Sequence, residues 1–229
     1  MFHNFSLNQM IVMLVPLLFA VTVHEVAHGY IAYRLGDNTA RLAGRLTLNP
    51  LKHLDFFGSF LLPALLKLTG SPVVFGYAKP VPVNFAKLHD LKKGTLYVAS
   101  AGCAANLTLT ALSGFFFQIL LKFGPLWYGS IFRPVVMDLF LMLGYSVLIN
   151  SVLAIFNLIP IPPLDGSRIL AMFLPEAFQK KFLKIERFGM LIIIFLLISN
   201  ILNRLITFFL VPLLNLSLGR EGARFMFGS

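Results

Sequence analysis

Two histidines and a glutamate near the N-terminus have the types and the spacing that metal chemistry needs. His24 and His28 are four residues apart, and Glu25 follows the first of them. On a helix this spacing puts both imidazoles on one face, about one turn and 6 Å of rise apart. Neutral imidazoles bind zinc, and a glutamate that stays off the metal can act as a general base toward water. The segment therefore predicts a metal site, with a chance grouping of polar residues at a helix end as the alternative.

A catalytic zinc needs a third protein ligand and an open position for water. Asp165 stands out among the remaining acidic residues and histidines, because it follows three prolines in the segment NLIPIPPLDG. These prolines must end the preceding helix near the cytoplasmic face, where His24 and His28 are also expected to emerge. An N-cap role for a helix from Gly166 to Leu174 is the alternative, and local signals favour the two roles equally.

The elements that position these residues must lie in a membrane. Of 229 residues, 58% are hydrophobic and 12% are charged, and the mean hydropathy is +0.83, whereas soluble domains carry about 25% charge. This composition excludes a water-soluble enzyme and a disordered chain, and the single cysteine, Cys103, excludes a disulfide scaffold. We therefore expect an all-α multi-pass membrane protein in contact with the lipid bilayer. The net charge of +10 is attributed to loops on one side of the membrane, with no nucleic-acid partner.

Four apolar segments are long enough to cross a bilayer. They cover approximately residues 7–33, 95–121, 135–160 and 188–210. The uninterrupted apolar part of the first is only 14 residues, Met10 to Val23, so a crossing must include the histidine motif. We expect the first three spans to form a three-helix catalytic core and the fourth to be a C-terminal transmembrane helix. Residues 1–229 are expected to form a single membrane-embedded domain.

Two segments between the first and second spans are expected to approach the core without crossing. Residues 56–68 are apolar but contain Gly58 and Pro63, which favours a re-entrant element. Residues 71–84 combine β-branched residues with three prolines, so we expect an extended element. We hypothesise that residues 73–83 hold an unwound substrate segment by strand addition.

The basic residues indicate the orientation of the chain. With residues 56–68 not crossing, residues 34–93 hold nine Lys and Arg and residues 161–187 hold five, whereas the opposite side holds four. This bias predicts that the N-terminus lies outside and that the candidate metal site faces the cytoplasm. His53 and Asp55, just before the re-entrant segment, are interpreted as polar residues at the membrane interface, with a role in supporting the metal ligands as the alternative.

Four motifs together are more specific than the histidine motif alone. They are HEVAHGY in the first span, GRLTLNPLKHLDFFGSFLLP at 44–63, GYAKPVPVN at 76–84, and NLIPIPPLDG at 157–166. With these motifs, which are spread over most of its length, the chain resembles the site-2 protease family of intramembrane zinc metalloproteases, in its short form without an added soluble domain. The resemblance implies that His24, His28 and Asp165 bind one Zn²⁺ and that Glu25 is the general base.

The resemblance also implies a role in substrate binding for two asparagines. Asn157 would contact substrate or stabilise the oxyanion, a task that suits a side-chain amide donor. An interhelical hydrogen bond is the alternative for this residue. Asn106 is the second candidate, since the family pattern retains it, although the family often has Gly-Pro where this chain has Gly102-Cys103.

The expected reaction is the hydrolysis of peptide bonds in or near transmembrane segments of membrane proteins, as in regulated intramembrane proteolysis. The expected partners are such transmembrane substrates, and the expected location is the cell membrane. Two rival hypotheses keep the metal site but not the reaction. One is a membrane transporter that passes metal through the cluster, and the other is a zinc-containing scaffold that binds membrane proteins without cutting them.

Overall fold

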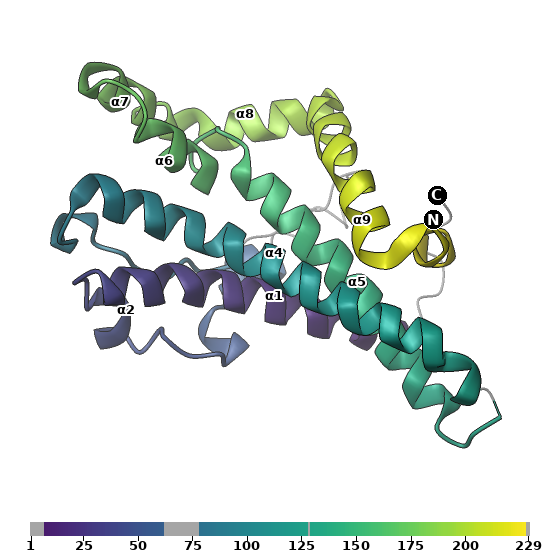
Figure 1. Cartoon of the computed structure of the whole chain (residues 1–229). Coiled ribbons are helices and arrows are strands. Elements are labelled where there is room, and N and C mark those ends of the chain that lie inside the picture. Colours follow the sequence, from purple (N-terminus) through teal and green to yellow (C-terminus); the bar gives the residue numbers. More distant parts are fainter. Residues whose placement is uncertain (1–6, 62–77, 128, 228–229) are drawn as a thin grey trace. The chain divides into compact units, whose positions relative to one another are not determined.

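Helices make up most of the chain, as the apolar segments predict (Figure 1). The computed structural model describes residues 7–61, 78–127 and 129–227. These ranges contain no strand, and four of their helices are long and apolar enough to cross a membrane, which confirms an all-α multi-pass membrane protein. In chain order, the elements are α1 (Leu7–Arg34), α2 (Thr39–Leu42), η1 (Pro50–Lys52), η2 (Phe56–Leu61), η3 (Phe85–Lys87), α4 (Leu91–Phe123), η4 (Gly124–Trp127), α5 (Arg133–Leu158), α6 (Asp165–Ala171), α7 (Glu176–Leu183), α8 (Glu186–Ile198) and α9 (Ile201–Phe227).

The last apolar stretch is divided differently from the expected span at 188–210. Helix α8 has only 13 residues and ends at Ile198, and α9 is the fourth helix of membrane-crossing length. The break falls at Asn200, whose φ of +60° lies in the left-handed region that asparagine tolerates better than most residues. The Asn200 side chain then accepts a hydrogen bond from Asn203 Nδ2 at 2.9 Å. Two polar residues, Ser199 and Asn200, therefore separate a short helix from the C-terminal one.

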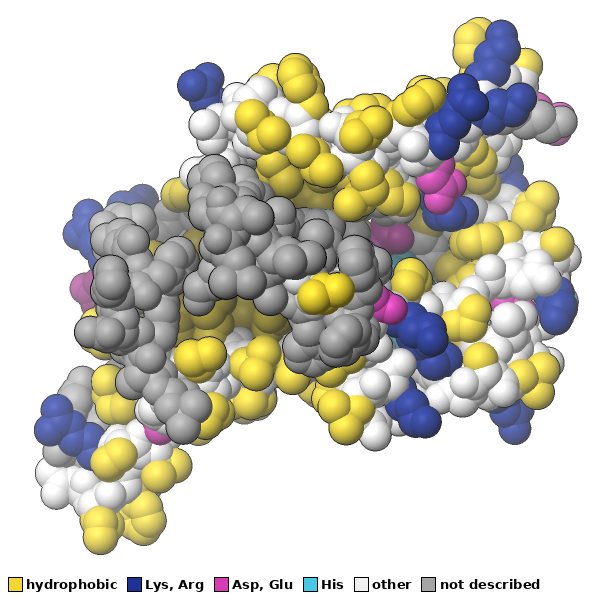
Figure 2. Space-filling model, turned by 180° about the vertical axis from the view of Figure 1, so that it is seen from behind, with side chains coloured by type: hydrophobic (Ala, Val, Ile, Leu, Met, Phe, Trp, Pro, Cys, Tyr) yellow, Lys and Arg dark blue, Asp and Glu magenta, His cyan; other side chains and the backbone are white. Residues whose placement is uncertain are grey.

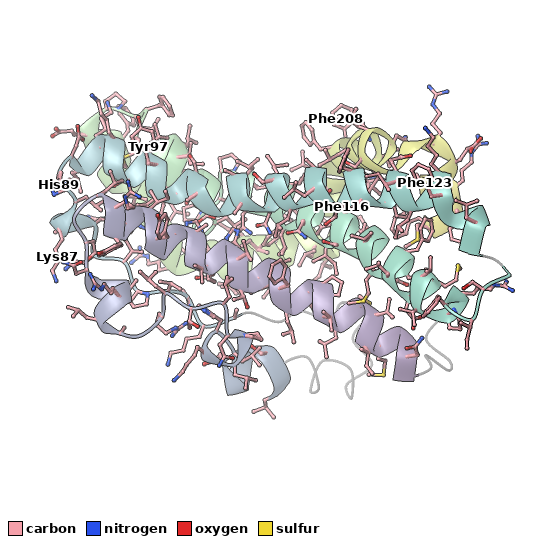
Figure 3. All side chains as sticks on the ribbon, turned by 60° about the horizontal axis from the view of Figure 1, so that its bottom comes forward. Lys87, His89, Tyr97, Phe116, Phe123 and Phe208 are labelled. Atoms are coloured by element: carbon pink, nitrogen blue, oxygen red, sulfur yellow. The ribbon has the colours of Figure 1, made fainter. Side chains whose placement is uncertain are left out.

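Large apolar side chains cover much of the surface of these helices. Hydrophobic groups occupy broad areas between patches of Lys and Arg (Figure 2). Tyr97, Phe116, Phe123 and Phe208 point away from their helices (Figure 3), and they are 58%, 52%, 47% and 73% exposed. In water such exposure would be costly, so it fits helices that face lipid.

The described chain forms two compact units. The first contains the described residues up to Ala20, together with 104–156 and those from Arg204 onward. Its core is built around Phe117 and Phe140, whose rings stack with centroids 4.2 Å apart. Polar pairs also join α4 to α5 here: Asn106 Nδ2 donates to Asn150 Oδ1 at 2.8 Å, and Ser113 contacts Ser146 at 2.8 Å.

The second unit contains residues 157–203 and the described residues between 21 and 103, and the turn after α1 organises much of it. Asp37 is fully buried: its Oδ1 accepts hydrogen bonds from the backbone and hydroxyl of Thr39, and its Oδ2 accepts one from Asn84 N at 2.6 Å. Gly36, at φ +110°, lets the chain turn where a Cβ would lie 2.8 Å from His89 Nε2. Lys87 and His89 accordingly lie beside the end of α1 (Figure 3), and His89 N donates to Leu35 O at 3.0 Å.

Asp37 should contribute pH-dependent stability. Burial raises the pKa of this carboxyl group, but the hydrogen bonds from Thr39 and Asn84 outweigh burial and bring the pKa below its ordinary value of 3.8. A lowered pKa stabilises the fold at pH values above the ordinary pKa, and the contribution is lost as the pH falls through the folded-state value. We expect Asp37→Ala to lower the free energy of unfolding by about 1–3 kcal/mol near neutral pH, as measured by denaturant unfolding in detergent. The difference from wild type should shrink below about pH 4, and a difference that stays constant down to acid pH would contradict this role.

The Asn106–Asn150 hydrogen bond should stabilise the first unit. Asn106→Leu would leave Asn150 without this partner in an apolar surrounding, so we expect a loss of about 1–2 kcal/mol. The double variant Asn106→Leu/Asn150→Leu should recover part of that loss, because both polar groups are then removed. Thermal unfolding of wild type, the single variant and the double variant in the same detergent measures these losses. A single variant that melts like wild type would show that the bond contributes no stability.

Candidate active site

The three expected metal ligands meet in the second unit. His24 and His28 are 7% and 9% exposed, on one face of α1, with ring centroids 4.6 Å apart. Their Nε2 atoms lie 3.1 Å from each other, and they lie 3.3 Å and 3.1 Å from Asp165 Oδ2. Ligands held about 2.0–2.1 Å from a tetrahedral zinc ion would be separated by about 3.3 Å. The three donor atoms therefore have the spacing of three corners of a tetrahedral site.

The protonation of His28 supplies a second test of the fit to a cation. Its Nδ1 lies 2.7 Å from Val98 O, and a carbonyl can only accept, so Nδ1 carries the proton. In the neutral ring, Nε2 then presents a lone pair to Asp165 Oδ2, which is also an acceptor. Two facing acceptors in a buried site are unfavourable unless a cation or an added proton lies between them. The backbone of α4 thus holds His28 in the tautomer that binds metal.

Glycine 102 on α4 lets the imidazoles lie this close to the helix. A Cβ at Gly102 would overlap His28 Nε2 and would lie 2.5 Å from His24 Cε1. No ordinary side chain fits there unless the histidines move. In the sequence, Gly102 stood out only through the cysteine that follows it in place of the family's proline, and its role in shaping the site was missed.

Asp165 is the first residue of α6, and it reaches the histidines from the proline-rich loop. Leu164 takes the N-cap position and makes no side-chain cap bond, so the N-cap hypothesis for Asp165 is wrong, and the helix ends at Ala171 rather than Leu174. Burial raises the pKa of Asp165, but without a metal the hydrogen bonds and the positive charge of the two protonated histidines outweigh burial, and the net shift of the pKa is downward. The carboxylate is therefore held in the charged form that a metal ligand requires.

Two glycines allow the Asp165 loop to pack tightly. A Cβ at Gly166 would overlap Leu158 O, and one at Gly189 on α8 would overlap Pro162 O. Ser167 Oγ also donates to Leu164 O at 2.6 Å. Close backbone contacts therefore set where Asp165 lies, in addition to the prolines that the sequence shows.

Glu25 points to a different neighbour from the histidines. Its Oε2 accepts a hydrogen bond from the backbone N–H of Val81 at 2.7 Å. Residues 78–84 have no helical structure, in keeping with the expected extended element, whereas residues 71–77 of that element and 62–68 of the expected re-entrant segment lie outside the described residues. The first part of the re-entrant segment is the π-helical turn η2.

The remaining candidate residues lie in different parts of the structure. Asn157 is half-buried near the end of α5 in the second unit, while Asn106 is fully buried and belongs to the first. His53 is 1% exposed and its Nε2 donates to Thr47 O at 2.8 Å, so its side chain is buried within the protein. Cys103 is buried with its Sγ 3.9 Å from Asp165 Oδ2.

Comparison with known proteins agrees with the class that this site defines. The model of Peptidase family M50 matches residues 133–200, which include Asp165. "Putative zinc metalloprotease YwhC" of Bacillus subtilis (strain 168) is 35% identical over 214 residues, covering 93% of this chain and 90% of that protein. Two proteins named "Putative zinc metalloprotease Rip2" are 32% identical over 188 residues, in Mycolicibacterium smegmatis, and 28% identical over 186 residues, in Mycobacterium tuberculosis (strain H37Rv).

Each Rip2 match covers 66% of the relative, with 82% and 81% of this chain. No solved structure matches the chain. The four apolar helices, the family model and the names of the relatives support a membrane metallopeptidase. The chain belongs to Peptidase family M50, the site-2 protease family, which confirms the resemblance seen in its motifs.

Gly102→Ala should weaken metal binding without unfolding the protein. The added methyl group would displace both imidazoles, and we expect about tenfold to hundredfold weaker binding, comparable to the loss of a supporting group around a metal. Competition between the purified protein and a chelator, with Zn²⁺ as the probe, measures the affinity. Gly124→Ala is the matched control, because nothing lies within 4 Å of its Cβ position. Equal zinc affinities for the two variants would show that Gly102 does not shape the site.

Proposed function

We propose that this protein is an intramembrane zinc metalloprotease that hydrolyses peptide bonds in or near transmembrane segments. One observation carries the proposal. The Nε2 lone pair of His28 faces Asp165 Oδ2 at 3.1 Å within a triangle of donors that suits zinc, and the carboxylate-bearing Glu25 adjoins His24 on α1. Membership of a peptidase family and the names of the relatives support the same reaction.

His24, His28 and Asp165 would hold one zinc ion. The two imidazoles and one carboxylate leave a fourth position for water, as in catalytic rather than structural zinc sites. When bound, zinc lowers the pKa of water and polarises the scissile carbonyl. The donor spacing of 3.1–3.3 Å supports this role for all three residues.

Glu25 would move the proton. Its carboxylate would accept a proton from the attacking water and then deliver it to the leaving amine. Because Glu25 follows His24 directly, α1 supplies both metal ligands and the base from a single turn. Asn157 is the proposed substrate-binding donor for the developing oxyanion. Asn106, whose amide donates to Asn150, is also proposed to contact the substrate.

The substrate would be a transmembrane protein segment that unwinds at the cleavage position. Helical carbonyls are hydrogen-bonded and shielded, so residues that weaken a helix should favour cleavage. We propose that the chain acts as one metalloprotease domain, since α1, α4 and α5 each contribute residues to both compact units. The distribution of Lys and Arg supports an outside N-terminus and a site that opens toward the cytoplasm of the cell membrane.

A transporter or a scaffold would use the metal cluster without proton transfer. A transport site needs no base at position 25, and a structural zinc site usually has four protein ligands. The described residues provide a group of three close donors, and Glu25 lies beside it. This arrangement favours the protease.

Glu25→Gln should abolish cleavage and preserve the metal. We expect a fall of about 10²-fold to 10⁴-fold in the cleavage rate of tagged transmembrane segments, because the amide cannot accept the proton. The measurement uses purified protein in lipid or detergent, with zinc quantified in the same samples at about one per chain. The panel should include segments with and without glycine or proline near the middle.

Glu176→Gln is the matched control, since it makes the same change at an exposed residue of α7. It should cleave like wild type. Equal cleavage by wild type and Glu25→Gln would exclude Glu25 as the base, and zinc transport retained in Glu25→Gln without any proteolysis by wild type would favour the transporter.

A further inference from the structure

We infer that the backbone N–H of Val81 is a positioning group for Glu25, which holds one carboxylate oxygen so that the other can handle the proton. The inference rests on the proposed function for its catalytic consequence, but the contact itself can be tested separately. It assigns a role to the extended segment of residues 78–84 in addition to any contact with substrate.

The contact is short and joins an amide to a carboxylate. Val81 N lies 2.7 Å from Glu25 Oε2, and Val81 is 6% exposed. Hydrogen bonds to a carboxylate are shorter and stronger than those between neutral groups, and they strengthen further where water is excluded. Val81 is therefore well placed to limit the rotamers of Glu25.

The segment is anchored on both sides of Val81. On the N-terminal side, Lys79 N donates to His53 O at 2.9 Å, and the buried guanidinium of Arg45 donates to Lys79 O at 2.7 Å. On the C-terminal side, Asn84 N donates to Asp37 Oδ2 at 2.6 Å. The Val81 amide is thus held in place by contacts that do not involve Glu25.

The side chain of Val81 is held against α1 as well. A Cβ at Gly29 would lie 2.7 Å from Val81 Cγ1 and 2.8 Å from Leu46 Cδ2. Gly29 follows His28 directly, so the extended segment packs on the same turn of α1 that carries a metal ligand. The distance between the Val81 amide and the histidines is consequently set by close packing.

Fixing one oxygen of Glu25 has a chemical consequence. A carboxylate has two oxygens that can each accept a hydrogen bond, and carboxylates in general can also bind zinc. With Oε2 bonded to Val81, the carboxylate is kept from turning toward the metal donors as a further ligand, and Oε1 is left for the water proton. Loss of the amide N–H should therefore slow the proton transfer more than it weakens substrate binding.

Two measurements test the inference. In the first, amide hydrogen exchange at Val81 is compared between wild type and Glu25→Ala, both loaded with zinc. We expect exchange to be faster by about tenfold or more in the variant, because its amide has lost a charged acceptor. Unchanged exchange at Val81 would overturn the contact, whether or not any substrate is cleaved.

In the second measurement, the α-hydroxy analogue of valine replaces Val81, so that an ester oxygen takes the place of the N–H and the side chain is retained. We expect kcat to fall by about tenfold or more, with KM and zinc content unchanged. The same backbone replacement at Ile131, a β-branched residue that is 88% exposed and lies outside this segment, is the control and should leave kcat close to wild type. Val81→Pro removes the same N–H by ordinary mutagenesis.

The outcomes separate the inference from the proposed function. Normal kcat in the Val81 ester, with an inactive Glu25→Gln, would overturn positioning by Val81 while the protease stands. A higher kcat would overturn it too, since the contact would then restrain the base. Absence of cleavage by zinc-loaded wild type would defeat the proposed function together with the catalytic role of Val81, and the exchange measurement would still decide the contact.

Discussion

The structure depends on placing polar groups inside an apolar helix. An imidazole pair and a carboxylate on α1 are costly in a membrane-crossing segment unless each group has a partner. His28 meets this requirement through Val98 O on Nδ1, and on Nε2 through Asp165 when a cation or a proton lies between the two acceptors. The loops around α1 follow from the same need, because they bring Asp165 and Val81 to groups that would otherwise be buried alone.

The close approach of backbone segments allows these partners to reach the polar groups of α1. Glycine occurs where α1 or the Asp165 loop touches a neighbour: Gly102 under the imidazoles, Gly29 under Val81, and Gly189 under Pro162 O. In each case a methyl group would lie closer than van der Waals contact allows. The geometry of the donors is therefore set by helix spacing, and the chemistry of the site depends on residues that have no functional group.

The sequence predicts which side chains form the candidate site, but it does not predict which backbone groups contact them. The pattern of His24, Glu25 and His28 is visible because spacing on a helix is fixed by its geometry. For Asp165, local signals favoured a zinc ligand and a helix N-cap equally, and only the family motifs favoured the zinc ligand. The break at Asn200 was missed although Asn200 and Asn203 interrupt the apolar stretch, because a left-handed φ depends on how the chain packs after the turn.

Two backbone groups complete the site, and neither has a residue-type signature. Val98 O selects the tautomer of His28, and Val81 N–H selects the orientation of Glu25. Any residue except proline at 81 offers the same N–H, so the valine in the sequence reports only packing against Gly29.

The prolines at 80 and 82 explain why only the Val81 amide reaches Glu25. They lack N–H groups, so Val81 supplies the sole backbone donor of this three-residue stretch, and the extended backbone that prolines favour presents it to α1. Glu25 therefore meets one donor from this stretch, and a shift of the segment by one residue would place a proline opposite the carboxylate and remove the bond.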